Sequence, residues 1–75
     1  MQMSILDVRG LRCPLPALIA RRVLARAAAG LAIEVLSDDP LAAVDVPHMC
    51  TQEGYEIVDI RRQAHVTRFI LRRPG

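Results

Sequence analysis

The sequence predicts a two-layer α/β (α+β) sandwich in which two helices cover one face of a mixed four-stranded sheet. Three observations lead to this prediction. The chain has 75 residues, which is enough for one domain with a single layer of helices on a sheet. Only 3% of its residues are aromatic, so aliphatic side chains must form the core. Its hydrophobic residues recur with strand and helix periods in the order β-α-β-α-β-β, and we expect residues 1–75 to form a single domain.

The first strand and the first helix flank a loop that begins at Gly10. Polar and apolar residues alternate from Ser4 to Arg9, as in a strand with one buried face. The helical period then runs from Pro14 to Ala29, because proline suits the first helical turn and Gly30 supplies a stop signal. One side of this helix is apolar. The other side carries two leucines and three arginines, namely Leu15, Leu18, Arg21, Arg22 and Arg26.

A central strand and the second helix come next. Leu31–Ser37 is a short aliphatic run, and a right-handed crossover through the first helix makes it parallel to the first strand. Asp39 precedes a proline and is a strong N-cap signal for the second helix. We expect Pro47 to interrupt this helix, so that His48–Glu53 continues as a displaced or kinked turn.

The last two strands form a predicted hairpin. Tyr55–Arg61 and Val66–Arg72 both have strand character, and the polar residues 62–65 between them favour antiparallel pairing. With this order of elements, both helices lie on one face of the sheet. The other face must tolerate water, which agrees with the acidic residues of the predicted strands: Asp7, Glu34 and Asp59.

The charge pattern restricts the partners that the chain can bind. Its net charge is only +2, but all 10 basic residues are arginines and several lie near Cys13. Arginine forks suit phosphate and carboxylate partners. The chain has no aromatic stacking platform and no G-x-x-G loop, so we do not expect direct nucleic-acid binding. An acidic protein partner, or simply a solvated face, explains the same arginines.

The sequence predicts neither a membrane span nor a leader peptide. The longest apolar stretches, such as Val23–Ile33, are interrupted by Arg26 and Gly30 and are too short to cross a bilayer. Met1–Ser4 contains no basic stretch and no apolar signal segment. Two cysteines without a secretion signal fit a reducing compartment. We therefore expect free thiols and a cytoplasmic location.

Cys13 is the strongest candidate for a functional residue. It lies in Arg12-Cys13-Pro14-Leu15-Pro16, where a loop becomes a helix. Free backbone N–H groups and the helix dipole lower the pKa of a thiol in such a place, and we expect Leu15 N–H to donate to a thiolate that Arg12 and Arg9 also stabilise. The two prolines stiffen the turn. No general base and no substrate pocket are evident, which indicates a nucleophile whose chemistry partners complete. The alternative is that Cys13 is merely a small residue before two prolines.

The second cysteine, Cys50, is expected to be structural, because buried free cysteine is common. A redox or resolving role, with a reversible disulfide to Cys13, remains an alternative. His48-x-Cys50 is the only close pair of potential metal ligands, and we expect no metal.

Around Cys13 the chain resembles the TusA/SirA family of small sulfur-carrier proteins. The stretch Leu6-Asp7-x-Arg9-Gly10-Leu11-Arg12-Cys13-Pro14-Leu15-Pro16 contains the Cys-Pro-x-Pro signature, and the resemblance continues through Ser37–Pro40 and Asp45–Cys50 into the final strand pair. It implies a two-layer sandwich and a transient persulfide on Cys13. It also implies that a cysteine desulfurase or a rhodanese supplies sulfane sulfur and that a downstream protein receives it, in routes to tRNA 2-thiouridine, molybdenum cofactor or sulfur oxidation. The position of Leu15 is often acidic in the family, which bears on the choice of partner.

We therefore expect a sulfur carrier that acts as a sulfurtransferase component, with no resident cofactor and no membrane partner. Partners are expected to dock on Arg9, Leu15, Leu18, Arg21 and Arg22. The alternative is a small regulatory module that binds RNA or protein without sulfur chemistry.

Overall fold

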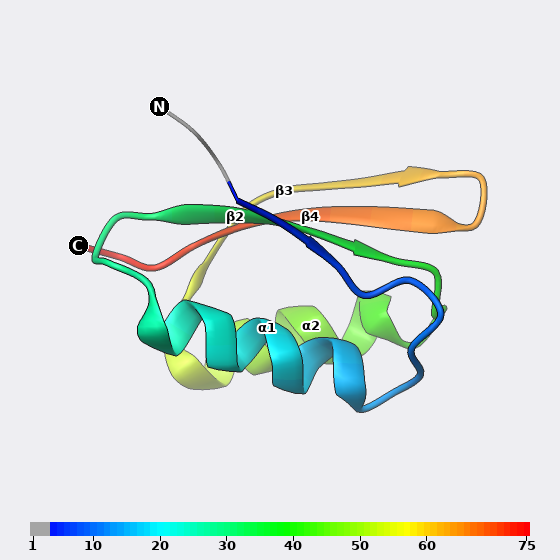
Figure 1. Ribbon diagram of the computed structural model, residues 1–75, viewed down its shortest axis with the longest axis horizontal. Helices are drawn as coiled ribbons and strands as arrows, with labels where there is room; N and C mark the ends of the chain where they lie inside the picture. The colour runs from blue at the N-terminus through cyan, green and yellow to red at the C-terminus, as the bar shows by residue number, and fades with distance from the viewer. Residues whose placement is uncertain (1–3) are drawn as a thin grey trace.

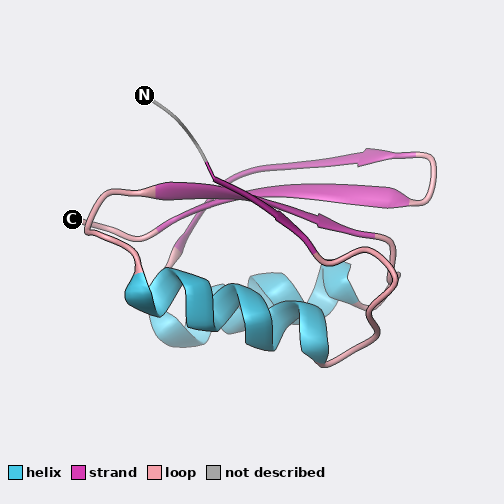
Figure 2. Ribbon diagram, viewed as in Figure 1, coloured by secondary structure: helices cyan, strands magenta, loops and turns pink. Residues whose placement is uncertain are grey.

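A four-stranded sheet covered by two helices makes up the structure, a computed structural model that describes residues 4–75. In the sheet order β1-β2-β4-β3, β1 and β2 are parallel and the other neighbours are antiparallel. Both helices lie side by side on one face (Figure 1, Figure 2), so the predicted fold is confirmed. The elements are β1 (Ser4–Asp7), α1 (Leu15–Arg26), β2 (Ala32–Ser37), α2 (Ala42–Glu53), β3 (Glu56–Gln63) and β4 (Val66–Arg72).

Met1–Met3, which belong to the stretch that predicts the absence of a leader, lie outside the described residues. Within residues 4–75, neither helix has the length and apolar character needed to cross a bilayer.

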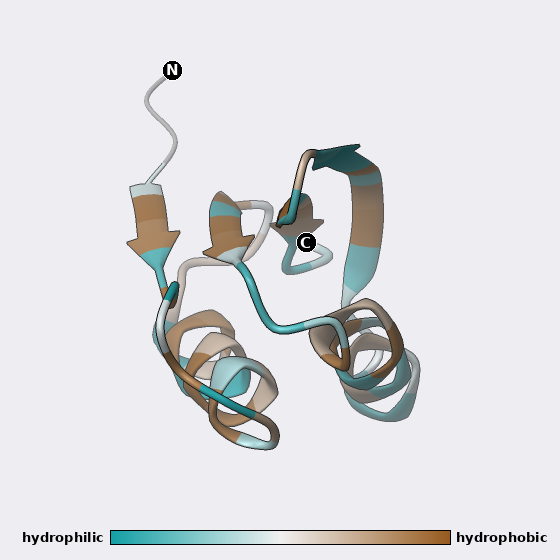
Figure 3. Ribbon diagram, turned by 90° about the vertical axis from the view of Figure 1, so that its right-hand side faces the viewer, coloured by the Kyte–Doolittle hydropathy of each residue, from teal (hydrophilic) through white to brown (hydrophobic). Residues whose placement is uncertain are grey.

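The core lies between the sheet and the helices, as the end-on view in Figure 3 shows. Ile33 and Val35 of β2 pair in register with Leu71 and Phe69 of β4, and all four side chains are fully buried. Alternate residues of these central strands therefore face the helices. The helices contribute buried side chains to the same cluster: Ala17, Ala20, Leu24, Ala42, Val46, Met49 and Cys50.

Tertiary contacts set the C-terminal end of α1. The helix begins after Pro14, which is its N-cap, and ends at Arg26 instead of the predicted Ala29. One Nη of Arg73 donates to the carbonyl oxygens of Ala25 and Ala27 at 2.9 and 2.7 Å, and so satisfies acceptors of the last helical turn. The chain end after β4 therefore stops α1 earlier than the local sequence predicts.

The predicted interruption of the second helix is wrong, because α2 continues through Pro47. Proline at this position removes the hydrogen bond to the carbonyl of Ala43, which lies in the first turn of the helix and is exposed, so water can satisfy it. The N-cap is Leu41 and not Asp39. Asp39 still supports the helix start, since its Oδ1 accepts a hydrogen bond from Leu41 N–H at 3.2 Å.

The connection between β3 and β4 is tighter than predicted. β3 extends to Gln63 instead of Arg61, which leaves only Ala64 and His65 in the turn. Ala64 has a φ of 57°, in the left-handed region. Two-residue hairpin turns require such a positive φ value, and this conformation is higher in free energy for alanine than for glycine.

Replacing Ala64 with glycine should raise the free energy of unfolding by about 0.5–1 kcal/mol, because glycine adopts the left-handed conformation without strain. Urea denaturation followed by circular dichroism measures this change. Ala25→Gly inside α1 is the matched control and should lower stability by roughly 1 kcal/mol. A loss of stability in Ala64→Gly would contradict the assignment of this turn.

Candidate functional site

Two loops at one end of the sheet form the candidate site. Because β1 and β2 are parallel, the loops that follow them leave the same edge of the sheet (Figure 1). The first loop carries Cys13, whose side chain is exposed, and leads into α1. The second carries Asp38 and Asp39 and leads into α2.

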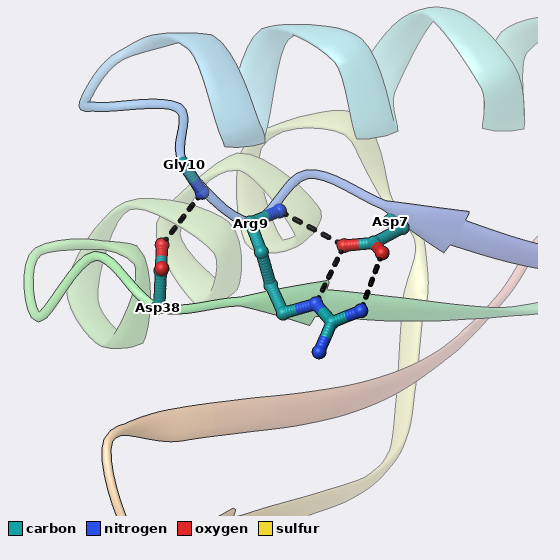
Figure 4. A network of polar contacts seen from close by, with 4 residues as sticks. All are labelled: Asp7, Arg9, Gly10 and Asp38. Carbon is teal, nitrogen blue, oxygen red and sulfur yellow. Dashed lines mark hydrogen bonds and ion pairs between the residues drawn. The ribbon is translucent and has the colours of Figure 1, made fainter.

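Carboxylates of the second loop hold the backbone of the first. Asp38 Oδ1 accepts a hydrogen bond from Gly10 N–H at 2.9 Å (Figure 4). Asp39 Oδ2 accepts one from Cys13 N–H at 2.6 Å, and the Asp39 residue is only 6% exposed. Hydrogen bonds to ionised acceptors are stronger than neutral ones. Asp38 and Asp39 thus fix the path of the chain on both sides of Arg12.

The Arg9 side chain pairs with Asp7. Its Nε and one Nη donate to the two carboxylate oxygens of Asp7 at 2.9 and 2.7 Å (Figure 4). These hydrogen bonds hold the pKa of Asp7 at about 2. The guanidinium is therefore engaged by Asp7, in contrast to the expected contribution of Arg9 to a thiolate at Cys13.

The sulfur of Cys13 has an acidic neighbour that the sequence did not indicate. Cys13 Sγ donates a hydrogen bond to Oδ2 of Asp45, which lies in the first turn of α2. This hydrogen bond raises the pKa of the Cys13 thiol, and partial burial and the negative charges of Asp45 and Asp39 raise it further. The predicted lowering of this pKa is thus wrong.

The expected thiolate-stabilising groups do not act on the sulfur as predicted. Leu15 N–H donates to the carbonyl oxygen of Arg12 at 2.9 Å and is therefore engaged by the backbone. Arg12 itself is exposed. The helix dipole of α1 is a local effect, whereas Asp45 is in direct contact with the sulfur, and a contacting charge outweighs a partial one.

A hollow of about 250 Å³ adjoins Cys13 between the two helices. Leu18 and Arg21 line it from α1, and Asp45 and His48 line it from α2. The hollow is largely open to solvent, so the expectation that Cys13 has no substrate pocket stays a prediction. His48 lies near the cysteine despite their separation in the sequence. Pro14 also borders the hollow, whereas Pro16 is buried.

The remaining predicted docking residues lie on the exposed side of α1. Leu15 and Leu18 are 45% and 42% exposed. Arg21 and Arg22 border a second hollow beside Glu53 of α2. Within residues 4–75, every ion pair lies on the sheet or in the loop after β1, and none involves an arginine of α1. This helix therefore presents unpaired positive charge.

Cys50 differs from Cys13 in accessibility, because Cys13 is exposed and Cys50 is buried. It is fully buried in the core, and burial raises its pKa to about 11. Both cysteines are free thiols in this structure. These features agree with the expected structural role of Cys50. Among the residues that the structure describes, no group of three or more His, Cys, Asp or Glu side chains is placed to hold a metal ion.

Sequence reasoning missed the roles of Asp39 and Asp45 at this site. It assigned Asp39 to helix capping alone, although the predicted parallel pairing already placed its loop beside that of Cys13. The approach of Asp45 depends on how α1 and α2 pack, which no local pattern reveals. Two exposed apolar side chains near the start of α2, Leu41 and Val44, were also missed; they are 56% and 66% exposed.

Comparison with known proteins adds two findings. A family model described as sulfurtransferase TusA matches residues 4–73. Among solved structures, the crystal structure of a SirA-like protein from Desulfitobacterium hafniense matches with a TM-score of 0.83 and 24% sequence identity. The match covers 97% of this chain and 100% of that one. At this identity the structural match supports the fold alone.

Proposed function

Because the chain belongs to the sulfurtransferase TusA family, we propose that it carries sulfane sulfur as a persulfide on Cys13 and relays it between proteins. The donor is a cysteine desulfurase or a rhodanese. The acceptor is a downstream protein of a sulfur route, such as tRNA 2-thiolation, molybdenum-cofactor synthesis or sulfur oxidation. A reducing compartment such as the cytoplasm keeps the carrier cysteine available as a thiol.

The accessibility of Cys13 is the observation that carries this proposal. Of the two thiols, Cys13 is exposed at the junction of both helices, whereas Cys50 is 0% exposed. A carrier must present its sulfur to two partners in turn, and an exposed loop held by a rigid scaffold suits this task. The hydrogen bonds from Gly10 and Cys13 to Asp38 and Asp39 provide that rigidity.

The transfer step needs only a thiol and a persulfide. The thiolate of Cys13 attacks the outer sulfur of the donor persulfide, and a new S–S bond forms on Cys13. The S–S bond of the donor breaks, and the donor cysteine leaves as a thiolate that takes up a proton. Sulfane sulfur is transferred without net oxidation or reduction, so no external electron acceptor is required.

The exposed arginines of α1 favour an acidic protein surface as the docking partner. Arg21 and Arg22 have no ion-pair partner within residues 4–75. Leu18 and Arg21 line both the hollow beside Cys13 and the second hollow, which Arg22 also borders. Apolar contacts surrounded by positive charge give both contact area and electrostatic complementarity.

Sulfur loading on Cys13 is the direct test. Incubation with a cysteine desulfurase, L-cysteine and pyridoxal phosphate should add one sulfur atom to the protein, and peptide mapping by mass spectrometry should place it on Cys13. Cys13→Ser should abolish loading, because serine cannot form a persulfide. Cys50→Ala is the matched control and should load normally, since its sulfur is buried.

Equal loading of Cys13→Ser would refute the proposal. The same variant also distinguishes the RNA-binding alternative, because direct RNA binding would survive the substitution and weaken steeply with added salt.

A further inference from the structure

Carboxylates dominate the immediate surroundings of Cys13. Asp39 accepts a hydrogen bond from its backbone N–H, and Asp45 accepts one from its sulfur. The other charged or titratable groups near the sulfur are Arg12 in its own loop, and Arg21 and His48 across the adjoining hollow. None of these is within ion-pair distance of Asp45 or Asp39 in the described part of the chain.

The hydrogen bond between Cys13 and Asp45 requires a proton on the sulfur. A carboxylate can only accept hydrogen bonds, so the sulfur must carry the proton. If Cys13 were a thiolate, two negatively charged groups would lie in contact without a proton between them. The contact with Asp45 therefore stabilises the protonated form of the unloaded cysteine.

Loading removes the donor from this contact. In a persulfide, Sγ is bonded to Cβ and to the outer sulfur, and any proton resides on the outer sulfur. For example, glutathione persulfide and the thiol of Cys13 exchange to give glutathione and the persulfide of Cys13, and the proton of Sγ passes to the glutathione thiolate that leaves. Sγ can then no longer donate to Asp45.

We propose that Asp45 is a positioning residue that holds the unloaded Cys13 thiol in a hydrogen bond and releases it when the cysteine becomes loaded with sulfur. This inference rests on the proposed function and adds to it a contact that differs between the two states of the carrier. In the unloaded state the contact also limits reaction with small electrophiles, because the thiolate is the nucleophile.

The first test measures the reactivity of the unloaded thiol. The rate of alkylation of Cys13 by iodoacetamide is followed as a function of pH in the native protein and in Asp45→Asn. Removing the charge should shift the pH profile of Cys13 to lower pH. A shift of one pH unit raises the thiolate fraction about tenfold and lowers its nucleophilicity about threefold, so we expect alkylation about threefold faster at pH 7.

Asp59→Asn is the matched control, because it removes the same charge from the open face of the sheet, away from Cys13. It should leave the profile of Cys13 unchanged. Equal or slower alkylation in Asp45→Asn, with native circular dichroism, would overturn the proposal.

The second test follows Asp45 in the native protein by carbon NMR of its carboxyl group. Loading with glutathione persulfide should move this resonance, whereas the resonance of Asp59 should stay in place. If Cys13 loads normally and the Asp45 resonance does not move, this inference alone is overturned. If Cys13 accepts no sulfur, the proposed function fails and the state-dependent contact fails with it.

Discussion

Replacing Phe69 with alanine should lower the free energy of unfolding by about 3–5 kcal/mol, since a large side chain is removed from the centre of the core. Phe69 is the largest fully buried side chain, and its neighbours in the sheet are Val35 and Ile60. A domain of this size has only about 5 kcal/mol of stability to lose. We therefore expect Phe69→Ala to be largely unfolded at 37 °C.

Urea denaturation at 10 °C, followed by circular dichroism, measures the effect of Phe69→Ala. Phe69→Leu is the matched control, because it keeps most of the buried volume and should cost less than about 1.5 kcal/mol. Equal losses for the two variants would show that the volume at this position is not what stabilises the domain.

Reversing the charges of Arg21 and Arg22 should slow sulfur transfer from a protein donor by about tenfold or more, because like charges across an interface cost several kcal/mol. The double variant Arg21→Glu/Arg22→Glu should slow loading from glutathione persulfide much less than loading from the protein donor, since a small donor does not need the docking surface and feels only the change of charge near Cys13. The measurement compares loading rates from a cysteine desulfurase and from glutathione persulfide by mass spectrometry.

Arg61→Glu/Arg62→Glu is the matched control for this second prediction. It makes the same change in net charge at the end of β3, where Arg61 pairs with Asp59 at 2.9 Å. If both double variants slow loading from the protein donor equally, net charge and not the surface of α1 governs docking. If neither variant slows this loading, α1 is not the docking surface.

The regular elements of the fold follow from local periodicity. The period of two from Val66 to Arg72 predicts β4 with its observed bounds, because each side chain faces either the core or solvent. The exposed positions of Leu15 and Leu18 follow in the same way from the helical period of α1. These predictions succeed because they depend only on neighbours along the chain.

The electrostatics of Cys13 could not be predicted in this way. The rule that a helix N-terminus lowers a thiol pKa is local, and it holds only where no stronger charge is near. Asp39 and Asp45 reach the cysteine through the parallel pairing of β1 and β2 and the packing of α1 against α2. The continuity of α2 through Pro47 likewise depends on tertiary surroundings, because the carbonyl of Ala43, which loses its helical hydrogen bond, is exposed to water.

The end of the chain offers a place to attach a reporter. Gly30 N–H donates to the carbonyl of Arg73 at 2.6 Å, which anchors the last residues at the far end of α1 from Cys13 (Figure 1). A helix of 12 residues separates the two ends by about 18 Å. A small fluorophore attached after Gly75 would therefore lie well away from Cys13, and the passage of the carrier from one enzyme to the next could be followed in real time.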